Sequence, residues 1–99
     1  MRSRYTAYAI GEVRHLIRTT DPEGPHHQND RGAWADELRG YCERVDFVGL
    51  EILASHADGD QGFVHFRARL SHDGAESVQE ERSRFRRKKR RWLYISGQT

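Results

Sequence analysis

The chain has 99 residues, of which 35% are hydrophobic and 32% are charged, so it has room for one domain with a modest core. Its apolar stretches are far shorter than a membrane span, and we expect no contact with a membrane. The single cysteine, Cys42, excludes an internal disulfide and a cysteine-rich zinc site. The basic N-terminus has no signal-like apolar block, so a cytoplasmic location is expected.

The net charge of +2 hides an uneven distribution of charge along the chain. Residues 82–99 carry eight Lys or Arg and no acid, whereas residues 1–81 carry nine cations and fifteen acids, a balance of −6. The field of the molecule should therefore be lopsided, and its basic end should favour an acidic partner.

The N-terminal third of the chain has helical patterning. Apolar residues recur at helical spacing and predict one helix over about residues 3–19, with Gly11 as a weak point. The helix should end ahead of Pro22, because a residue that precedes proline is pushed out of the helical region. After a loop that contains both prolines, Asp30 is a plausible N-cap for a second helix over about residues 33–43.

From residue 47 onward the apolar pattern has a period of two, which is typical of strands. The expected strands cover about residues 47–55, 63–70, 77–86 and 91–96. Asp73-Gly74 is a strong hairpin signal between the second and third strands. Two helices followed by an antiparallel sheet of about four strands make an α+β domain, and we expect this single domain to cover residues 1–99.

Five blocks of sequence occur in one order: MRSRYTAY, GLEIL, GFVHFRARL, ERSRF and RWLYISG. Together they resemble the central domain of the YchJ-type family of uncharacterised bacterial proteins, over nearly the whole chain. The resemblance implies a nuclear-transport-factor-two-like fold, in which a strongly curved sheet wraps helices into a cone with an interior cavity. Family members typically flank this domain with cysteine-rich SEC-C zinc-binding motifs, and neither motif occurs in these 99 residues. The resemblance implies no particular reaction.

The strand over residues 63–70 alternates so regularly that it has two distinct faces. The favoured interpretation places the face with His65 and Arg67 in solvent. In the alternative, that face points into the cone, where a histidine beside a carboxylate can transfer protons near neutral pH. The candidate ligand-binding residues are Tyr8, His65, Arg67, Glu81 and Ser83. The sequence contains no nucleophile, Walker or dinucleotide motif, so we assign no catalytic residue and no cofactor.

Arg2 and Arg4 lie in the first turn of the first predicted helix. They either reach an anion in the cavity or pair with a carboxylate of the sheet, such as Glu80 or Glu81, and the ion pair is favoured because buried charges need partners.

The segment RFRRKKRRWLY contains six consecutive cations. It is interpreted first as a solvated hairpin tip, with weak, salt-sensitive contact to nucleic acid or another anion as the alternative. The candidate anion-binding residues are Arg86, Arg87, Lys88, Lys89, Arg90 and Arg91. The group His26, His27 and Asp30 resembles a metal site only superficially, and a mobile polar loop without metal is favoured.

These observations favour a non-catalytic domain that binds a ligand or another protein, and a possible homodimer formed through the exposed face of the sheet. A small-molecule enzyme that uses the cone cavity is the alternative, and nucleic acid is expected to bind weakly or not at all.

Overall fold

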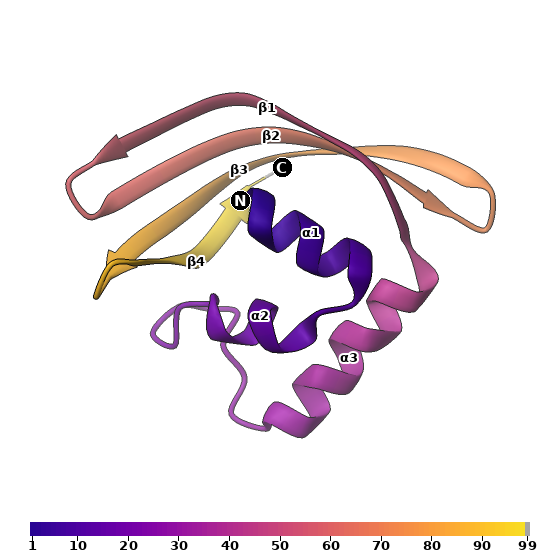
Figure 1. Cartoon of the computed structure of the whole chain (residues 1–99), viewed down its shortest axis with the longest axis horizontal. Helices are drawn as coiled ribbons and strands as arrows, with labels where there is room; N and C mark the ends of the chain where they lie inside the picture. The colour runs from indigo at the N-terminus through magenta and orange to yellow at the C-terminus, as the bar shows by residue number, and fades with distance from the viewer. Residues whose placement is uncertain (99) are drawn as a thin grey trace.

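The computed structural model describes residues 1–98, which form one curved antiparallel sheet and three helices (Figure 1). The helices are α1 (Arg2–Ile10), α2 (Val13–Arg18) and α3 (Arg31–Arg44). The strands are β1 (Asp46–Asp58), β2 (Gln61–His72), β3 (Ala75–Lys88) and β4 (Arg91–Gln98), in the spatial order β1-β2-β3-β4. The α+β class and the antiparallel sheet expected from the sequence are confirmed. Among the described residues, no helix is long and apolar enough to cross a membrane.

The first predicted helix is divided into two shorter ones at Gly11. This glycine has φ 76° and ψ 27°, a left-handed conformation that ends α1. The N–H of Glu12 closes the turn by donating to the carbonyl of Ala7 at 2.8 Å. The change of direction brings α2 back alongside α1 instead of continuing it. At the start of α3, the predicted cap is confirmed, since Oδ1 of Asp30 accepts from the N–H of Ala33 at 3.0 Å.

Three tight turns connect the four strands. Asp73-Gly74 has φ values of 52° and 79°, as a two-residue hairpin turn requires, and confirms the predicted signal. The β3–β4 turn has φ values of 50° and 67° at Lys89 and Arg90, where no glycine or asparagine eases the left-handed backbone. The strands are longer than predicted because polar, charged and glycine residues, such as Gln61, Gly62 and Arg87, continue the pairing toward the turns.

The sheet is bent so that its concave side faces α1 and its convex side faces away from the helices (Figure 1). Register shifts in β1 near Val48 and Leu53 mark bulges, which bend a strand. On β2, the concave face carries the buried core residues Phe66, Ala68 and Leu70, as the alternation predicts. The opposite face of β2 is in solvent.

The chain that follows α2 continues the sheet beyond β4. Thr20 forms a parallel bridge with Tyr94, and the N–H of Asp21 donates to the carbonyl of Tyr94 at 2.8 Å. Asp21 is buried, and its Oδ1 accepts from Arg86 at 2.8 Å. These contacts fix the helical layer to the edge of the sheet and close one side of the cone.

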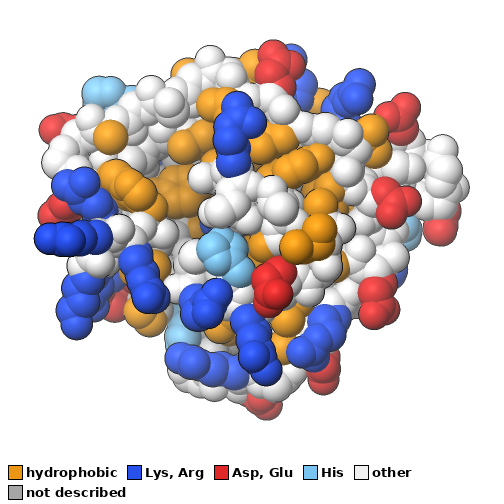
Figure 2. Space-filling model, viewed as in Figure 1, with side chains coloured by type: hydrophobic (Ala, Val, Ile, Leu, Met, Phe, Trp, Pro, Cys, Tyr) orange, Lys and Arg blue, Asp and Glu red, His pale blue; other side chains and the backbone are white. Residues whose placement is uncertain are grey.

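Charged side chains are unevenly distributed over the surface. On the face seen in Figure 2, Lys and Arg gather toward the left and lower part, while most Asp and Glu lie toward the right. The uneven charge inferred from the sequence is therefore also seen on this face of the folded molecule.

Candidate functional site

A cavity of about 300 Å³ lies between the concave side of the sheet and the helices. Its volume is at the lower end of the range for small-molecule sites. The side chains that line it are mostly apolar or aromatic and come from all three helices and every strand. They include Tyr5, Tyr8, Leu16, Trp34, Leu38, Tyr41, Phe47, Leu50, Phe66, Ala68 and Leu70.

One wall of the cavity is an aromatic cluster contributed by α1, α3 and β1. The ring of Tyr8 lies 5.9 Å from that of Tyr41 and 5.5 Å from that of Phe47, measured between ring centres. The Tyr41 and Phe47 rings are 6.0 Å apart in an edge-on arrangement. Burial raises the pKa of both tyrosines, so their hydroxyls stay protonated and can donate hydrogen bonds into the cavity.

Arg4 supplies the positive charge of the cavity and is only 6% exposed. Its Nη1 donates to the carbonyl of Leu16 at 3.1 Å and to Oγ1 of Thr19 at 2.7 Å, and its guanidinium carbon lies 4.6 Å from the centre of the Tyr94 ring. No carboxylate of residues 1–98 lies within 4.0 Å of Arg4, so the predicted ion pair with Glu80 or Glu81 is wrong. Burial lowers the pKa of Arg4, although an arginine remains charged.

Two carboxylates line the cavity, the exposed Glu37 on α3 and the partly buried Glu81 on the concave face of β3. Glu81 supplies the negative charge inside the cavity. Its Oε2 accepts from the hydroxyl of Ser83 at 2.5 Å and from the hydroxyl of Tyr94 at 3.2 Å. Gly97 packs directly against this carboxylate, and a side chain at that position would overlap it. Burial, followed by the charge of Glu81, raises the pKa of Tyr94. Tyr94 is therefore a neutral donor that holds the carboxylate in place.

Two predicted cavity residues lie elsewhere, on the convex side of the sheet. Nε2 of His65 is 3.1 Å from Oε2 of Glu80, and Nη2 of Arg67 is 2.9 Å from Oε1 of the same carboxylate. The two hydrogen bonds, that of His65 first, lower the pKa of Glu80. This agrees with the favoured interpretation, in which His65 and Arg67 lie outside the cone. The alternative that places them in the cavity is wrong, because the alternation that puts Phe66 in the core turns both side chains outward.

The other three predicted residues lie at or beside the cavity. Tyr8 and Glu81 line it, and Ser83 supports it from behind by its bond to Glu81. The candidate ligand-binding residues chosen from the sequence did not include Tyr94. They also did not include Arg4, which was expected to pair with a carboxylate and is instead buried without one among residues 1–98. The alternation of β4 contained part of the signal for Tyr94. Tyr94 pairs with Phe85, so its side chain shares the concave face of the sheet with Glu81.

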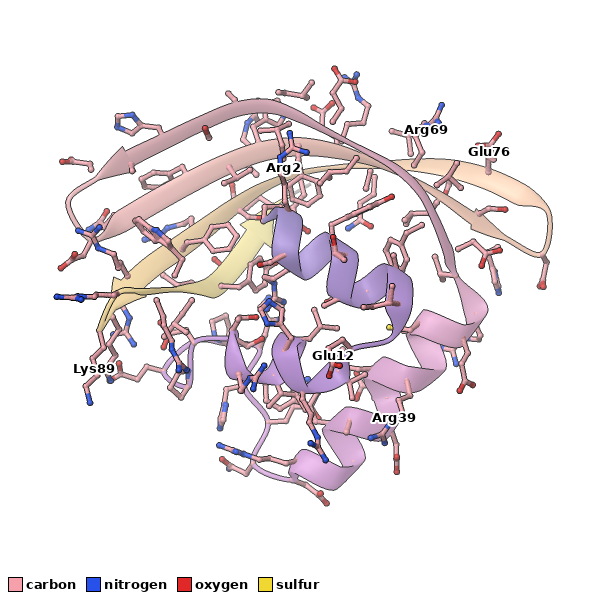
Figure 3. All side chains as sticks on the ribbon, viewed as in Figure 1. Arg2, Glu12, Arg39, Arg69, Glu76 and Lys89 are labelled. Carbon is pink, nitrogen blue, oxygen red and sulfur yellow. The ribbon has the colours of Figure 1, made fainter. Side chains whose placement is uncertain are left out.

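The basic segment forms the end of the β3–β4 hairpin, as the tip interpretation predicts. Arg86 pairs with Asp21 and with Glu23, whose Oε2 is 2.7 Å from Nη1 of Arg86. Its side chain therefore holds the loop that follows α2 against the sheet. Figure 3 shows Lys89 at the far end of the hairpin, pointing away from the body of the molecule. The turn itself is Lys89-Arg90. Arg87 is also engaged, with Nε 3.2 Å from Oδ1 of Asp60. Anion binding by the six cations stays a prediction.

The two loop histidines contact aromatic rings in different directions. The ring of His26 lies 5.7 Å from that of Tyr94, and the ring of His27 lies 5.5 Å from that of Trp34. Within residues 1–98, no three His, Cys, Asp or Glu side chains are grouped as metal ligands would be. Cys42 is half-buried and burial raises the pKa of its thiol, which does not favour a reactive thiolate.

The chain is similar in sequence and fold to known proteins. The family described as "YchJ, middle NTF2-like domain" matches residues 1–97. A UPF0225 protein of Pectobacterium carotovorum is 39% identical over 102 residues, which cover 98% of this chain and 63% of the relative. The chain therefore spans about three fifths of the length of curated relatives such as this one.

Two solved structures of proteins described as containing a SEC-C motif are similar to the chain. One, from Rhodopseudomonas palustris, has a TM-score of 0.85 and 38% identity, and the match covers 100% of this chain and 74% of the other. The second, from Psychrobacter arcticus, has a TM-score of 0.72 at 21% identity, covering 97% and 56%. At that lower identity the second match supports the fold alone.

Proposed function

The chain belongs to the YchJ middle-domain family of NTF2-like fold, and on that premise we propose that its cone cavity binds a small organic molecule without transforming it. The observation that carries the proposal is a pair of opposite charges in one apolar cavity. Arg4 and Glu81 both line the cavity, yet each is held by neutral groups and not by the other. Arg4 is buried and Glu81 is partly buried. Charges that are removed from water and not paired with each other are costly, and a polar ligand would compensate them.

The lining favours one class of ligand. Aromatic and aliphatic walls suit a flat or alicyclic apolar body, as in most small-molecule sites. Glu81 can accept a further hydrogen bond, and a ligand amine would bring both the donor and the complementary charge. We therefore favour a small aromatic or alicyclic amine, whose ring lies near Tyr8 and Phe47 and whose nitrogen reaches Glu81.

A binding role is favoured over catalysis because of the partners of Glu81. A catalytic general base needs a nucleophile or a water molecule within hydrogen-bond distance, and that nucleophile must be able to reach the substrate. A hydroxyl nucleophile would also donate to its base, but Ser83 is only 1% exposed and the raised pKa of Tyr94 keeps its hydroxyl protonated. Neither hydroxyl is therefore available to attack a ligand. This arrangement supports an anchor for a cationic group.

The test is a ligand screen with matched fragments. Amines, alcohols and carboxylates that share one aromatic skeleton are compared by ligand-observed NMR with the wild-type protein, Glu81→Gln and Glu80→Gln. The amines should bind best, and Glu81→Gln should weaken them about tenfold or more, as expected when a charged hydrogen bond is lost. Glu80→Gln makes the same change on the convex side and should have no effect. Equal binding of amines and carboxylates, unchanged by Glu81→Gln, would refute the proposal.

A homodimer formed through the exposed face of the sheet and a cytoplasmic location stay predictions. The single cysteine, a half-buried free thiol, supports a reducing compartment. Light scattering over a range of concentrations tests the dimer. On the convex face, Arg82 and Arg84 have no carboxylate within 4.0 Å among residues 1–98, and these like charges oppose a face-to-face pair.

A further inference from the structure

A second hollow, of about 320 Å³, lies on the convex side of the sheet, across from the cone cavity. It runs over all four strands, and its lining contains no Asp or Glu. The groove is defined by side chains that share the outward face: His56, Phe63, His65, Arg82, Arg84 and Ser96.

Strand register arranges these groove residues in two rows across the sheet. Direct cross-strand partners lie on one face with their side chains in contact distance. The first row is His56, Phe63, Arg84 and Ser96, and the second is Ala54, His65, Arg82 and Gln98. The groove is therefore a regular consequence of the sheet and needs no mobile loop to form.

The two arginines of the groove differ from their neighbours on the same face. Arg67 is neutralised by Glu80 at 2.9 Å, and Arg86 by Asp21 at 2.8 Å. Within residues 1–98, neither Arg82 nor Arg84 has a carboxylate within 4.0 Å. The groove thus presents two unneutralised guanidinium groups, which points to an anionic partner.

The groove also offers an aromatic surface. Phe63 is 39% exposed, which is unusual for a phenylalanine. Its ring and that of His56, its cross-strand neighbour, are within 24° of parallel, with centres 6.5 Å apart. Exposed aromatic rings on an antiparallel sheet, flanked by cations, are the means by which several domains bind single-stranded nucleic acids.

The cations are also spaced in a way that suits an extended chain. Arg82 and Arg84 are separated by about 6.8 Å, the distance between every second residue of a strand, and Lys88 continues the same alternation toward the hairpin end beyond the neutralised Arg86. A convex sheet touches a rigid duplex over a small area only, whereas a flexible single strand can follow the curve. An acidic peptide would match the charge but would leave Phe63 without a planar group, and a second copy would bring like charges together.

We propose that the convex face of the sheet binds single-stranded nucleic acid, with a base stacked on Phe63 and the phosphate backbone along Arg82 and Arg84. The proposal is independent of the cavity ligand, because the two sites lie on opposite sides of the sheet. It also differs from binding at the basic tip, since the determinants lie in the middle of the sheet.

The experiment measures fluorescence anisotropy of a labelled 12-residue oligothymidylate with the whole chain, from about 20 to 150 mM salt. The test variants are Phe63→Ala and Arg84→Gln. Their controls are Val78→Ala, an exposed apolar position on the same face, and Arg39→Gln, which lies on α3 away from the sheet (Figure 3). An abasic oligomer of the same length and polyglutamate both carry negative charge without nucleobases, so they test whether base stacking contributes to binding.

Phe63→Ala should weaken oligonucleotide binding about tenfold. Arg84→Gln should weaken it less and should lower the slope of log K against log salt by about 0.7. Both controls should bind as the wild type does, and the abasic oligomer should bind about tenfold more weakly. The proposal would be overturned if the abasic oligomer or polyglutamate bound as tightly as the oligothymidylate. It would also be overturned if the protein self-associated with rising concentration and Arg84→Gln strengthened that association. Oligonucleotide binding that is lost in Lys89→Asn but kept in both test variants would overturn it as well.

Discussion

The guanidinium carbon of Arg4 lies 4.6 Å from the centre of the Tyr94 ring, and the hydroxyl of the same ring donates to Glu81 at 3.2 Å. One tyrosine therefore holds a buried cation on its face and a carboxylate at its edge. The relationship also joins the first helix to the last strand, so it connects the stability of the fold to the chemistry of the cavity.

The first prediction concerns Arg4. Arg4→Lys removes the planar contact with Tyr94 and the branched donor that serves Leu16 and Thr19. We expect a loss of about 2–3 kcal/mol in the free energy of unfolding, measured by urea denaturation. Arg2→Lys, a change at an exposed position of the same helix (Figure 3), should cost less than about 0.5 kcal/mol. Equal stability of the two variants would show that the buried contacts of Arg4 are unimportant.

The second prediction concerns the β3–β4 turn. Lys89 and Arg90 hold left-handed conformations that Asn and Gly adopt more easily. The double change Lys89→Asn with Arg90→Gly should raise the free energy of unfolding by about 1 kcal/mol, seen as a higher Tm. Lys88→Asn removes a charge one position earlier without relieving the backbone, and it should bring no gain. A double variant no more stable than Lys88→Asn would contradict the turn geometry.

The third prediction concerns Gly97, which packs on the Glu81 carboxylate. Gly97→Ala should displace that carboxylate from Ser83 and Tyr94 and destabilise the protein by about 1–3 kcal/mol. The same change in a Glu81→Ala background should cost much less, because the displaced group is gone. A double-mutant cycle by urea denaturation measures this coupling, and additive effects would argue against the packing.

The fourth prediction concerns pH. Hydrogen bonds from His65 and Arg67 lower the pKa of Glu80 in the folded protein. A lowered carboxyl pKa stabilises the fold above the unfolded pKa, and this contribution is lost as the pH falls through the folded value. Glu80→Gln should therefore be less stable than wild type at about pH 7 and should approach it at about pH 2–3.

The control for this pH dependence is Glu76→Gln, on the same strand (Figure 3). Glu76 has no cation within 4.0 Å among residues 1–98, so its replacement should leave the pH profile unchanged. Parallel profiles for Glu80→Gln and wild type, measured by thermal denaturation from about pH 2 to 8, would show that the network contributes nothing.

Much of the fold could be predicted because its determinants are local. The alternation on β2 identifies Phe66, Ala68 and Leu70 as core, and the Asp30 cap and the Asp73-Gly74 turn each depend on a few adjacent residues. Gly11 was visible as a weak point, but only the packing of α2 against α1 shows that the helix ends there.

The cavity was harder to predict, because its residues come together only after folding. The hydrogen-bond partners of Arg4 follow it by twelve or more positions, and its ring contact is in the last strand. Sequence spacing cannot show such a pairing, so an ion pair with the sheet was the simpler expectation. His65 was a candidate cavity residue for a different reason. The alternation defines two faces of the strand but not which one points inward, and the chemistry of His65 suited the alternative in which the polar face lines the cavity.

The most direct test of a ligand-binding cavity is an ¹H–¹⁵N NMR titration with the amine fragment that binds best, using wild type and Ala68→Leu. Ala68 lines the cavity, and a leucine there would fill space that the ligand needs, while a circular dichroism spectrum checks the fold. We predict that wild type shows shifts at Tyr8, Leu50 and Tyr94, and that Ala68→Leu shows none. Shifts confined to the convex face, or unchanged in Ala68→Leu, would contradict the account.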